Sequence, residues 1–165
     1  MQVRMMNNTA EMQSCLEKAA RRVLEDAAFV FTESVNTTER PAGWKESVIQ
    51  ASLPYSGPVN GCFIIAAPPE LGAELAASIL GLEPDTYEAV DKAGDALAEI
   101  LNMLAGIVLE DTFQAEETWQ LGVPRVKSVS AGKHYAMMGQ TDVKIQLNTE
   151  EGGIVEVGLF LHKEI

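Results

Sequence analysis

Two long amphipathic segments, each followed by a pair of apolar strand-like segments, constrain the fold of this chain more than any other sequence feature. The tetrapeptide Val-Leu-Glu-Asp occurs at 23–26 and again at 108–111, and a phenylalanine follows each copy. Self-similarity at matched positions indicates a repeated structural unit, although any helix followed by a hairpin resembles another. The identical tetrapeptide favours duplication. We therefore expect a single domain with half-units at about 9–81 and 87–165.

In the first half, apolar residues recur every three to four positions over 9–32, which predicts a helix with Thr9 as its N-cap. Strands are predicted at 47–53 and 59–67, separated by a turn at 54–58. Residues 33–43 are expected to form a loop. A second helix is expected to begin at Pro68 and to end at Gly81, a residue suited to a left-handed C-cap.

In the second half, the apolar pattern predicts one long helix over 87–114. Residues 121–132 are expected to form a loop and a short strand, and two final strands are predicted at 141–148 and 154–162. The predicted fold class is α+β, with two pseudo-repeated helix/β-hairpin halves whose long helices pack on one face of an antiparallel sheet.

The formal net charge of −12 excludes some classes of partner. Nucleic acids and anionic membrane surfaces both require a basic face, so we expect neither. The acidity fits a partner that offers a basic group, or it simply maintains solubility. No apolar run is long enough to span a membrane and no signal peptide is indicated, so a cytoplasmic location is expected.

The cysteines and histidines show no metal-binding pattern. Cys15 and Cys62 lie far apart, and each is expected to be a buried apolar residue in a reducing compartment. His134 and His162 have no ligand at a suitable spacing. No metal site is therefore predicted.

A polar stripe on the long helix is the candidate functional site. Asp95, Glu99 and Asn102 share one side of a helix, opposite the apolar seam, and should face solvent. Gly106 and Glu110 continue the stripe. Asn102 and Gly106 are poor helix formers, and such local misfits are expected where function overrides propensity. The alternative is an ordinary solvated helix face, because charged runs are common on surfaces.

The residues around this stripe resemble the signature helix of the CheC/CheX/FliY family of response-regulator phosphatases. That pattern has an acid or serine, three residues, glutamate, two residues, asparagine, and a proline slightly more than twenty residues later. Asp95, Glu99 and Asn102 match it. Pro124 fills the last place, at a spacing one residue shorter than usual.

The resemblance implies an enzyme that removes phosphate from the aspartyl phosphate of a CheY-like response regulator in chemotaxis or two-component signalling. Glu99 and Asn102 would be catalytic: Asn102 would orient the attacking water, and Glu99 would pair with the active-site lysine of the regulator. Asp95, Gly106 and Pro124 would contribute to docking. No cofactor is expected on this chain, because the regulator would supply Mg²⁺. The alternative is a non-catalytic CheX-like module that binds a response regulator or a flagellar motor component.

The first helix lacks the motif. When the two Val-Leu-Glu-Asp copies are superimposed, Glu99 falls on Ser14, Asn102 on Glu17 and Gly106 on Arg21. A single copy of the motif resembles CheX more than CheC. That likeness implies a homodimer formed through the sheets, for which an exposed edge strand is a physical route.

Overall fold

The computed structural model describes residues 8–36, 39–41, 43, 44, 46–113 and 117–161. The helices are α1 (Thr9–Ala28), α2 (Pro69–Leu80), α3 (Tyr87–Asp91), α4 (Ala93–Thr112) and α5 (Ala131–Met138). The strands are β1 (Thr32–Ser34), β2 (Ser47–Ser56), β3 (Gly61–Ala67), β4 (Gln120–Leu121), β5 (Arg125–Ser130), β6 (Val143–Thr149) and β7 (Ile154–Leu161). None of the described helices is long and apolar enough to cross a membrane.

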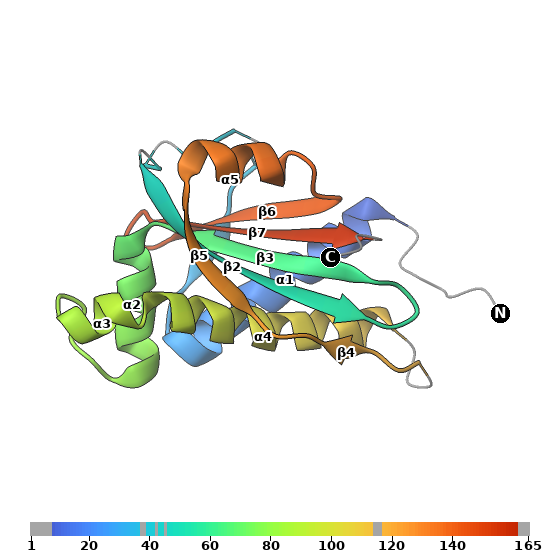
Figure 1. Ribbon diagram of the computed structural model, residues 1–165, viewed down its shortest axis with the longest axis horizontal. Helices are drawn as coiled ribbons and strands as arrows, with labels where there is room; N and C mark the ends of the chain where they lie inside the picture. The colour runs from blue at the N-terminus through green and yellow to red at the C-terminus, as the bar shows by residue number, and fades with distance from the viewer. Residues whose placement is uncertain (1–7, 37–38, 42, 45, 114–116, 162–165) are drawn as a thin grey trace.

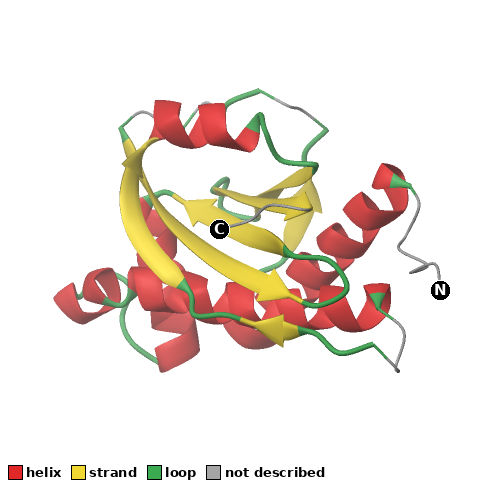
Figure 2. Cartoon of the chain, turned by 45° about the vertical axis from the view of Figure 1, so that its right-hand side comes forward, coloured by secondary structure: helices red, strands yellow, loops and turns green. Residues whose placement is uncertain are grey.

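The strands form one seven-stranded antiparallel sheet in the order β1-β6-β7-β3-β2-β4, and β5 pairs with β2 beside β4. The long helices α1 and α4 pack together on one face, with α2 at one end (Figure 1). The short helix α5 covers the opposite face (Figure 2). The predicted α+β class, with both long helices on one face of an antiparallel sheet, is confirmed.

Each half contributes a strand that pairs with the hairpin of the other half. Strand β1 pairs with β6, and β5 pairs with β2, whereas the central strands β3 and β7 pair with each other. The repeated tetrapeptides have the same burial in both helices: Val and Leu are buried, and Glu and Asp are exposed. Residues 9–81 and 87–161 thus contribute interlocked strands to one sheet, and their origin as repeated half-units stays a prediction.

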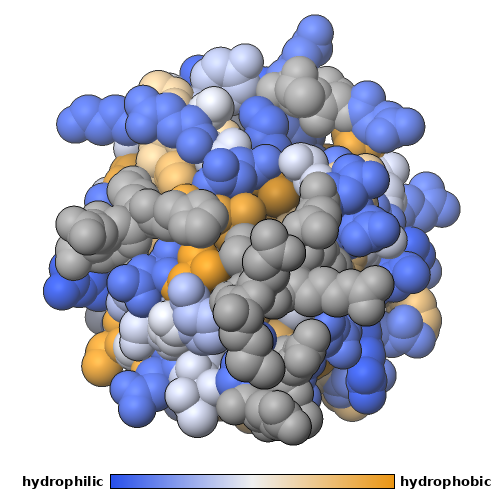
Figure 3. All heavy atoms as spheres, turned by 90° about the vertical axis from the view of Figure 1, so that its right-hand side faces the viewer, coloured by the Kyte–Doolittle hydropathy of each residue, from blue (hydrophilic) through white to orange (hydrophobic). Residues whose placement is uncertain are grey.

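The central strand β3 is buried at every position because both of its faces are covered. Phe63 and Ile65 join the main core beneath the long helices. Cys62 and Ile64 face the other way and pack against Met138 of α5. Both cysteines are free and buried, as predicted. Viewed from the end where α1 begins, described residues of the surface are mostly hydrophilic, with hydrophobic atoms gathered near the centre (Figure 3).

The ends of the first helix differ from the prediction. Asn8, not Thr9, is the N-cap, and its side chain accepts a hydrogen bond from the Ala10 N–H at 3.0 Å. The helix ends at Ala28, four residues early, because Phe29 adopts a left-handed backbone with φ of 56°. By contrast, α2 ends at Gly81 with φ of 69°, as predicted.

The predicted helix over 87–114 is two helices. The backbone of Lys92 (φ −91°, ψ 1°) departs from helical geometry and separates α3 from α4. The Lys92 N–H still donates to Glu88 O, and the Ala96 N–H donates to Lys92 O, so the two helices follow each other directly. α4 ends at Thr112, and residue 114 lies outside the described residues.

Three further elements differ from the prediction. β1 occupies part of the expected loop at 33–43, and α5 follows β5 where no helix was expected. Strand β2 continues to Ser56, through Pro54, which was assigned to a turn. Proline cannot donate to a neighbouring strand. Pro54 is accommodated because it lies between the stretches of β2 that pair with β5 and β4, where Pro54 O accepts from the Gly122 N–H at 2.7 Å.

Candidate functional site

Helix α4 carries the candidate site on its outer side. The apolar seam Leu97, Ile100, Leu101, Leu104 and Val108 is almost completely buried against the sheet and α1. Burial of this seam fixes the rotation of the helix about its axis. The opposite side of α4 must therefore face solvent.

Asp95, Glu99 and Asn102 are all exposed on that outer side, as predicted. At 100° per residue they fall within an arc of about 60° around the helix axis. Asn102 follows Glu99 by three positions along the helix, so their side chains are neighbours on the surface. The structure thus presents an acid and an amide together on a packed helix.

Glu99 and Asn102 have no side-chain partner among the described residues. Within the described parts of the chain, no hydrogen bond or ion pair involves either side chain. Asp95 is different, because its Oδ2 lies 3.5 Å from Nζ of Lys92. An exposed pair of this kind contributes only about 0.3–0.5 kcal/mol, so it does not prevent Asp95 from contacting another protein.

Gly106 lies one turn beyond Asn102 and is half-buried. A Cβ at this position would meet nothing within 4 Å. The glycine is therefore not required by packing inside the chain, and it leaves space beside the pair. A close approach by another backbone is the simplest use of such space.

Pro124 lies outside α4, immediately before β5, and is half-buried. Among the described residues, no hydrogen bond or ion pair joins it to Glu99 or Asn102. β5 crosses α4 near its N-terminal end, where Val126 lies over Gly94. Pro124 therefore borders the strand that flanks the stripe and is not itself part of the stripe.

The equivalent surface of α1 offers no free acid and amide. Glu17, which matches Asn102, accepts a hydrogen bond from the Ser34 hydroxyl and lies 3.8 Å from Nη1 of Arg21. Ser14, which matches Glu99, is exposed and uncharged. The first helix therefore carries no second copy of the site, in agreement with the sequence comparison of the two halves.

A buried polar cluster on the α5 face was not predicted. Gln50 Nε2 lies 2.8 Å from Nδ1 of His134, and His134 Nε2 lies 2.9 Å from Oε1 of Glu156. Gln146 Nε2 donates to Oε2 of Glu156 at 2.8 Å. Glu156 was the available sequence signal, because it interrupts the otherwise apolar strand β7. Gln50 and Gln146 lie in strands that contain other polar residues and give no such signal. Since each of these four side chains is at most 4 % exposed, the cluster holds α5 on the sheet and cannot reach a substrate.

A metal-binding cluster or a reactive thiol would be an alternative site among the described residues. These contain no group of three or more His, Cys, Asp or Glu side chains placed to hold a metal ion. Burial raises the pKa of the Cys15 thiol, and the nearby Asp111 raises it further, so this cysteine is a poor nucleophile. The exposed acid and amide of α4 remain the candidate site.

Comparisons with known proteins agree with this fold. A family model described as chemotaxis phosphatase CheX matches residues 49–148. Comparison with curated proteins gives no significant match.

Solved structures of chemotaxis proteins share the fold at low sequence identity. A chain in the CheX–CheY–BeF3–Mg²⁺ complex from Borrelia burgdorferi is 16 % identical, with a TM-score of 0.66 over 91 % of this chain and 97 % of that chain. CheX from Desulfovibrio desulfuricans is 18 % identical, with a TM-score of 0.64 over 92 % and 99 %. The FliM middle domain from Vibrio alginolyticus is 11 % identical, with a TM-score of 0.52 over 93 % of each chain.

Proposed function

Because this chain belongs to the chemotaxis phosphatase CheX family, we propose that it removes phosphate from the aspartyl phosphate of a CheY-like response regulator. The observation that carries the proposal is the pair Glu99 and Asn102, exposed side by side on a packed helix and without partners among the described residues. A relative from Borrelia burgdorferi was solved together with CheY, BeF3 and Mg²⁺, which supports the choice of partner.

Hydrolysis of an aspartyl phosphate requires placement more than covalent help. The oxygen of a water molecule bonds to phosphorus, the bond from phosphorus to the aspartate oxygen breaks, and the products are inorganic phosphate and a free carboxylate. Asn102 orients that water, since a carboxamide has both a donor and an acceptor and stays uncharged. Mg²⁺ belongs to the regulator, where it neutralises charge on the phosphoryl oxygens.

Glu99 positions the regulator. Its carboxylate pairs with the active-site lysine of the regulator and so fixes the distance between Asn102 and the phosphorus atom. Asp95 adds a second carboxylate at the rim, and Gly106 leaves room for the backbone of the regulator. Pro124 shapes the flanking strand connection. Because α4 is anchored by its buried seam, little conformational freedom is lost on docking.

The second candidate function is a non-catalytic module that binds a regulator or a flagellar motor component. The observation in its favour is that the FliM middle domain has the same fold. Binding of a regulator without turnover, unaffected by simultaneous replacement of Glu99 and Asn102, would support this alternative.

The test is the loss of phosphate from a phosphorylated CheY-type regulator mixed with the protein. We expect Asn102→Ala to slow the reaction about 10²- to 10³-fold, as for loss of one preorganised polar group. Its fold should be unchanged because Asn102 faces solvent. Ser14→Ala, at the exposed position of α1 that matches Glu99, is the control and should retain full activity. Full activity in Asn102→Ala would refute the proposed role.

We also propose that two copies pair through their sheets in the cytoplasm, where their substrate would be found. Strand β5 is almost entirely exposed and pairs only with β2 among the described strands, so its outer edge is open to a second chain. Sedimentation equilibrium would give the mass of a dimer. A monomer at all accessible concentrations would exclude this pairing.

A further inference from the structure

A groove of about 240 Å³ lies at the end of the molecule where α1 stops, between α2 and the β6–β7 turn. Its apolar wall includes Phe29, Phe31 and Leu71, and its polar wall includes Glu74, Glu150 and Glu151. No residue of α4 lines it. The groove is therefore separate from the site formed by Glu99 and Asn102.

The two phenylalanines of the groove are placed unfavourably for a free protein. Phe29 is 77 % exposed and Phe31 is 51 % exposed. Phe29 also occupies a left-handed position (φ 56°), for which glycine is preferred, whereas α2 has Gly81 at the corresponding place. Exposed aromatic residues that flank a groove are characteristic of a surface that a partner covers.

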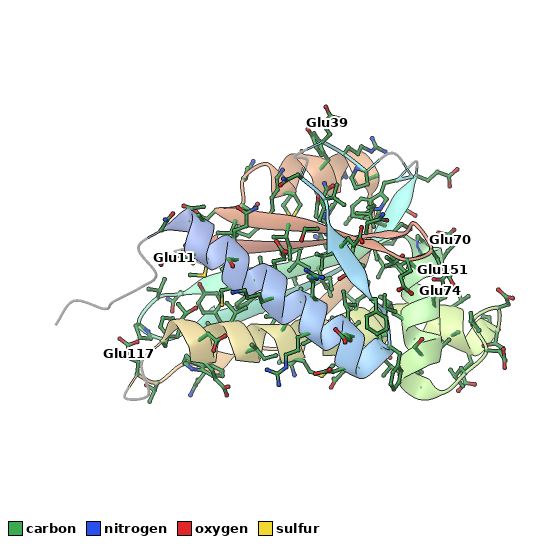
Figure 4. The ribbon with its side chains drawn as sticks, turned by 180° about the vertical axis from the view of Figure 1, so that it is seen from behind. Glu11, Glu39, Glu70, Glu74, Glu117 and Glu151 are labelled. Atoms are coloured by element: carbon green, nitrogen blue, oxygen red, sulfur yellow. The ribbon has the colours of Figure 1, made fainter. Side chains whose placement is uncertain are left out.

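The acidic residues of the groove belong to α2 and the β6–β7 turn, which are well anchored. Glu70, Glu74 and Glu151 lie together at the end formed by α2 and the β6–β7 turn (Figure 4). The turn is held by Thr149, whose N–H donates to Gly153 O at 2.8 Å and whose hydroxyl accepts from the Gly153 N–H at 3.0 Å. A Cβ at Gly153 would lie 3.0 Å from Leu71, so the turn packs directly on α2.

Nearby carboxylates, inside the groove and next to it, repel the charge on Glu74. Burial raises the pKa of Glu74, and Glu151, Asp85 and Glu70 raise it further. These three neighbours are all carboxylates, so each is negatively charged, as is ionised Glu74. A cation in the groove would relieve this repulsion.

We propose that this end groove is a docking site for a cationic amphipathic segment of a partner protein, in which an apolar side chain is flanked by lysine or arginine. The apolar side chain would lie against Phe29 and Phe31, and the basic groups would pair with Glu74 and Glu151. This inference does not rest on the proposed phosphatase activity.

The negative charge of the groove favours a basic segment over the other partners that could cover an apolar groove. A second copy of a chain with net charge −12 would bring more negative charge to an acidic rim. An anionic membrane surface would be repelled for the same reason. A basic amphipathic segment would make apolar contacts with the phenylalanines and ion pairs with the glutamates. Its affinity should fall as the salt concentration rises.

Three six-residue amidated peptides test the proposal: alternating arginine and phenylalanine, alternating arginine and serine, and alternating glutamate and phenylalanine. NMR spectra of the ¹⁵N-labelled protein locate the binding, and fluorescence anisotropy measures affinity. We expect only the arginine–phenylalanine peptide to shift the amide signals of residues 29–31, 71–78 and 149–151.

Two variants remove the two walls separately. Phe31→Ser and the double variant Glu74→Gln/Glu151→Gln should each weaken binding of that peptide by about fivefold, as expected for loss of one modest contact set. The matched control Glu25→Gln/Glu46→Gln removes two exposed charges outside the groove and should bind normally. Dispersed amide spectra establish that each variant is folded.

Other outcomes would overturn the proposal. Equal binding of the arginine–serine peptide, or equal weakening by the control variant, would show general attraction to an acidic protein. Signal shifts elsewhere would exclude the groove. Concentration-dependent self-association that Phe31→Ser abolishes would show that a second copy covers this surface.

Discussion

A Cβ atom added at Gly94 would lie 2.5 Å from Cγ1 of Val126, a separation that real carbon atoms do not tolerate. Strand β5 can cross α4 at this point only because residue 94 has no side chain. The crossing places β5 beside the stripe that carries Asp95, Glu99 and Asn102. Gly94 thus connects the packing of the sheet edge to the shape of the candidate site.

We predict that Gly94→Ala destabilises the protein. A helical alanine gains close to 1 kcal/mol over glycine, but overpacking against Val126 costs about 1–3 kcal/mol. The net loss should be about 1 kcal/mol, measured as the free energy of unfolding in urea. Val126→Ala in the same protein should restore part of the loss, and a stability gain in Gly94→Ala alone would contradict the crossing geometry.

Gly106→Ala should have the opposite effect on stability. The added methyl group meets nothing within 4 Å, so the variant should gain up to about 1 kcal/mol from helix propensity alone. Under the proposed function, the same methyl group fills the space beside Asn102 and should raise KM for the phosphorylated regulator. Improved stability with unchanged KM would show that this space is not used in docking.

Glu156→Leu should be strongly destabilising. Gln50 donates to Nδ1 of His134, so the histidine proton is on Nε2 and points at Glu156, which also accepts from Gln146. Leucine would leave the buried Nε2–H of His134 without an acceptor, whereas Gln146 Nε2 would keep its bond to Glu39 O. The expected cost is about 1–3 kcal/mol in the free energy of unfolding. Glu150→Gln, an exposed change in the adjoining turn, is the control and should change stability by less than about 0.5 kcal/mol.

Phe29→Gly should stabilise the protein, unusually for loss of a large apolar residue. Left-handed backbone costs a bulky residue about 1–2 kcal/mol, and the greater freedom of unfolded glycine offsets part of the gain. Since the side chain is 77 % exposed, little burial is lost. We expect a net gain of about 0.5 kcal/mol by urea denaturation, accompanied by weaker binding of the arginine–phenylalanine peptide. A large loss of stability would mean that the ring supports the fold.

Glu74→Gln should give a stability gain that depends on pH. The pKa of Glu74 is raised from its ordinary value of 4.5, so the folded protein disfavours the ionised carboxylate. The wild-type protein is therefore penalised at pH values above the raised pKa and is relieved as the pH falls below 4.5. Because the group is largely solvated, the gain at neutral pH should be only a few tenths of a kcal/mol. It should disappear in acid, and thermal unfolding across this range measures it. A gain that persists unchanged below pH 4 would require another cause.

The main elements could be predicted because their patterns are local. The apolar seam of α4 fixes which side of the helix is buried, and this was sufficient to place Glu99 and Asn102 on the surface. The hairpin of β6 and β7 also lies within two residues of its predicted bounds, apart from residue 162, which is outside the described part.

The elements that the sequence did not predict depend on contacts between residues that are distant in sequence. β1 has three residues and exists because Thr32 and its neighbours pair with β6, more than a hundred residues later. α5 is short and contains Gly132, and its buried His134 has no apolar signature. Its N-cap, Ser130, accepts from the Lys133 N–H and is recognisable only once the end of β5 is known. The end groove likewise combines three segments that no local pattern connects.

The pairing of β1 with β6 and of β5 with β2 exchanges strands between the two halves, which limits how this molecule can change over time. If either half were expressed alone, it would lack the strand that closes its own hairpin, and a bare backbone edge would remain. Division of the gene between the two halves is therefore expected to be unfavourable for this architecture. The exposed Glu99 and Asn102 of α4 and the hydrogen-bonded Glu17 of α1 are the kind of difference expected if the two halves have diverged.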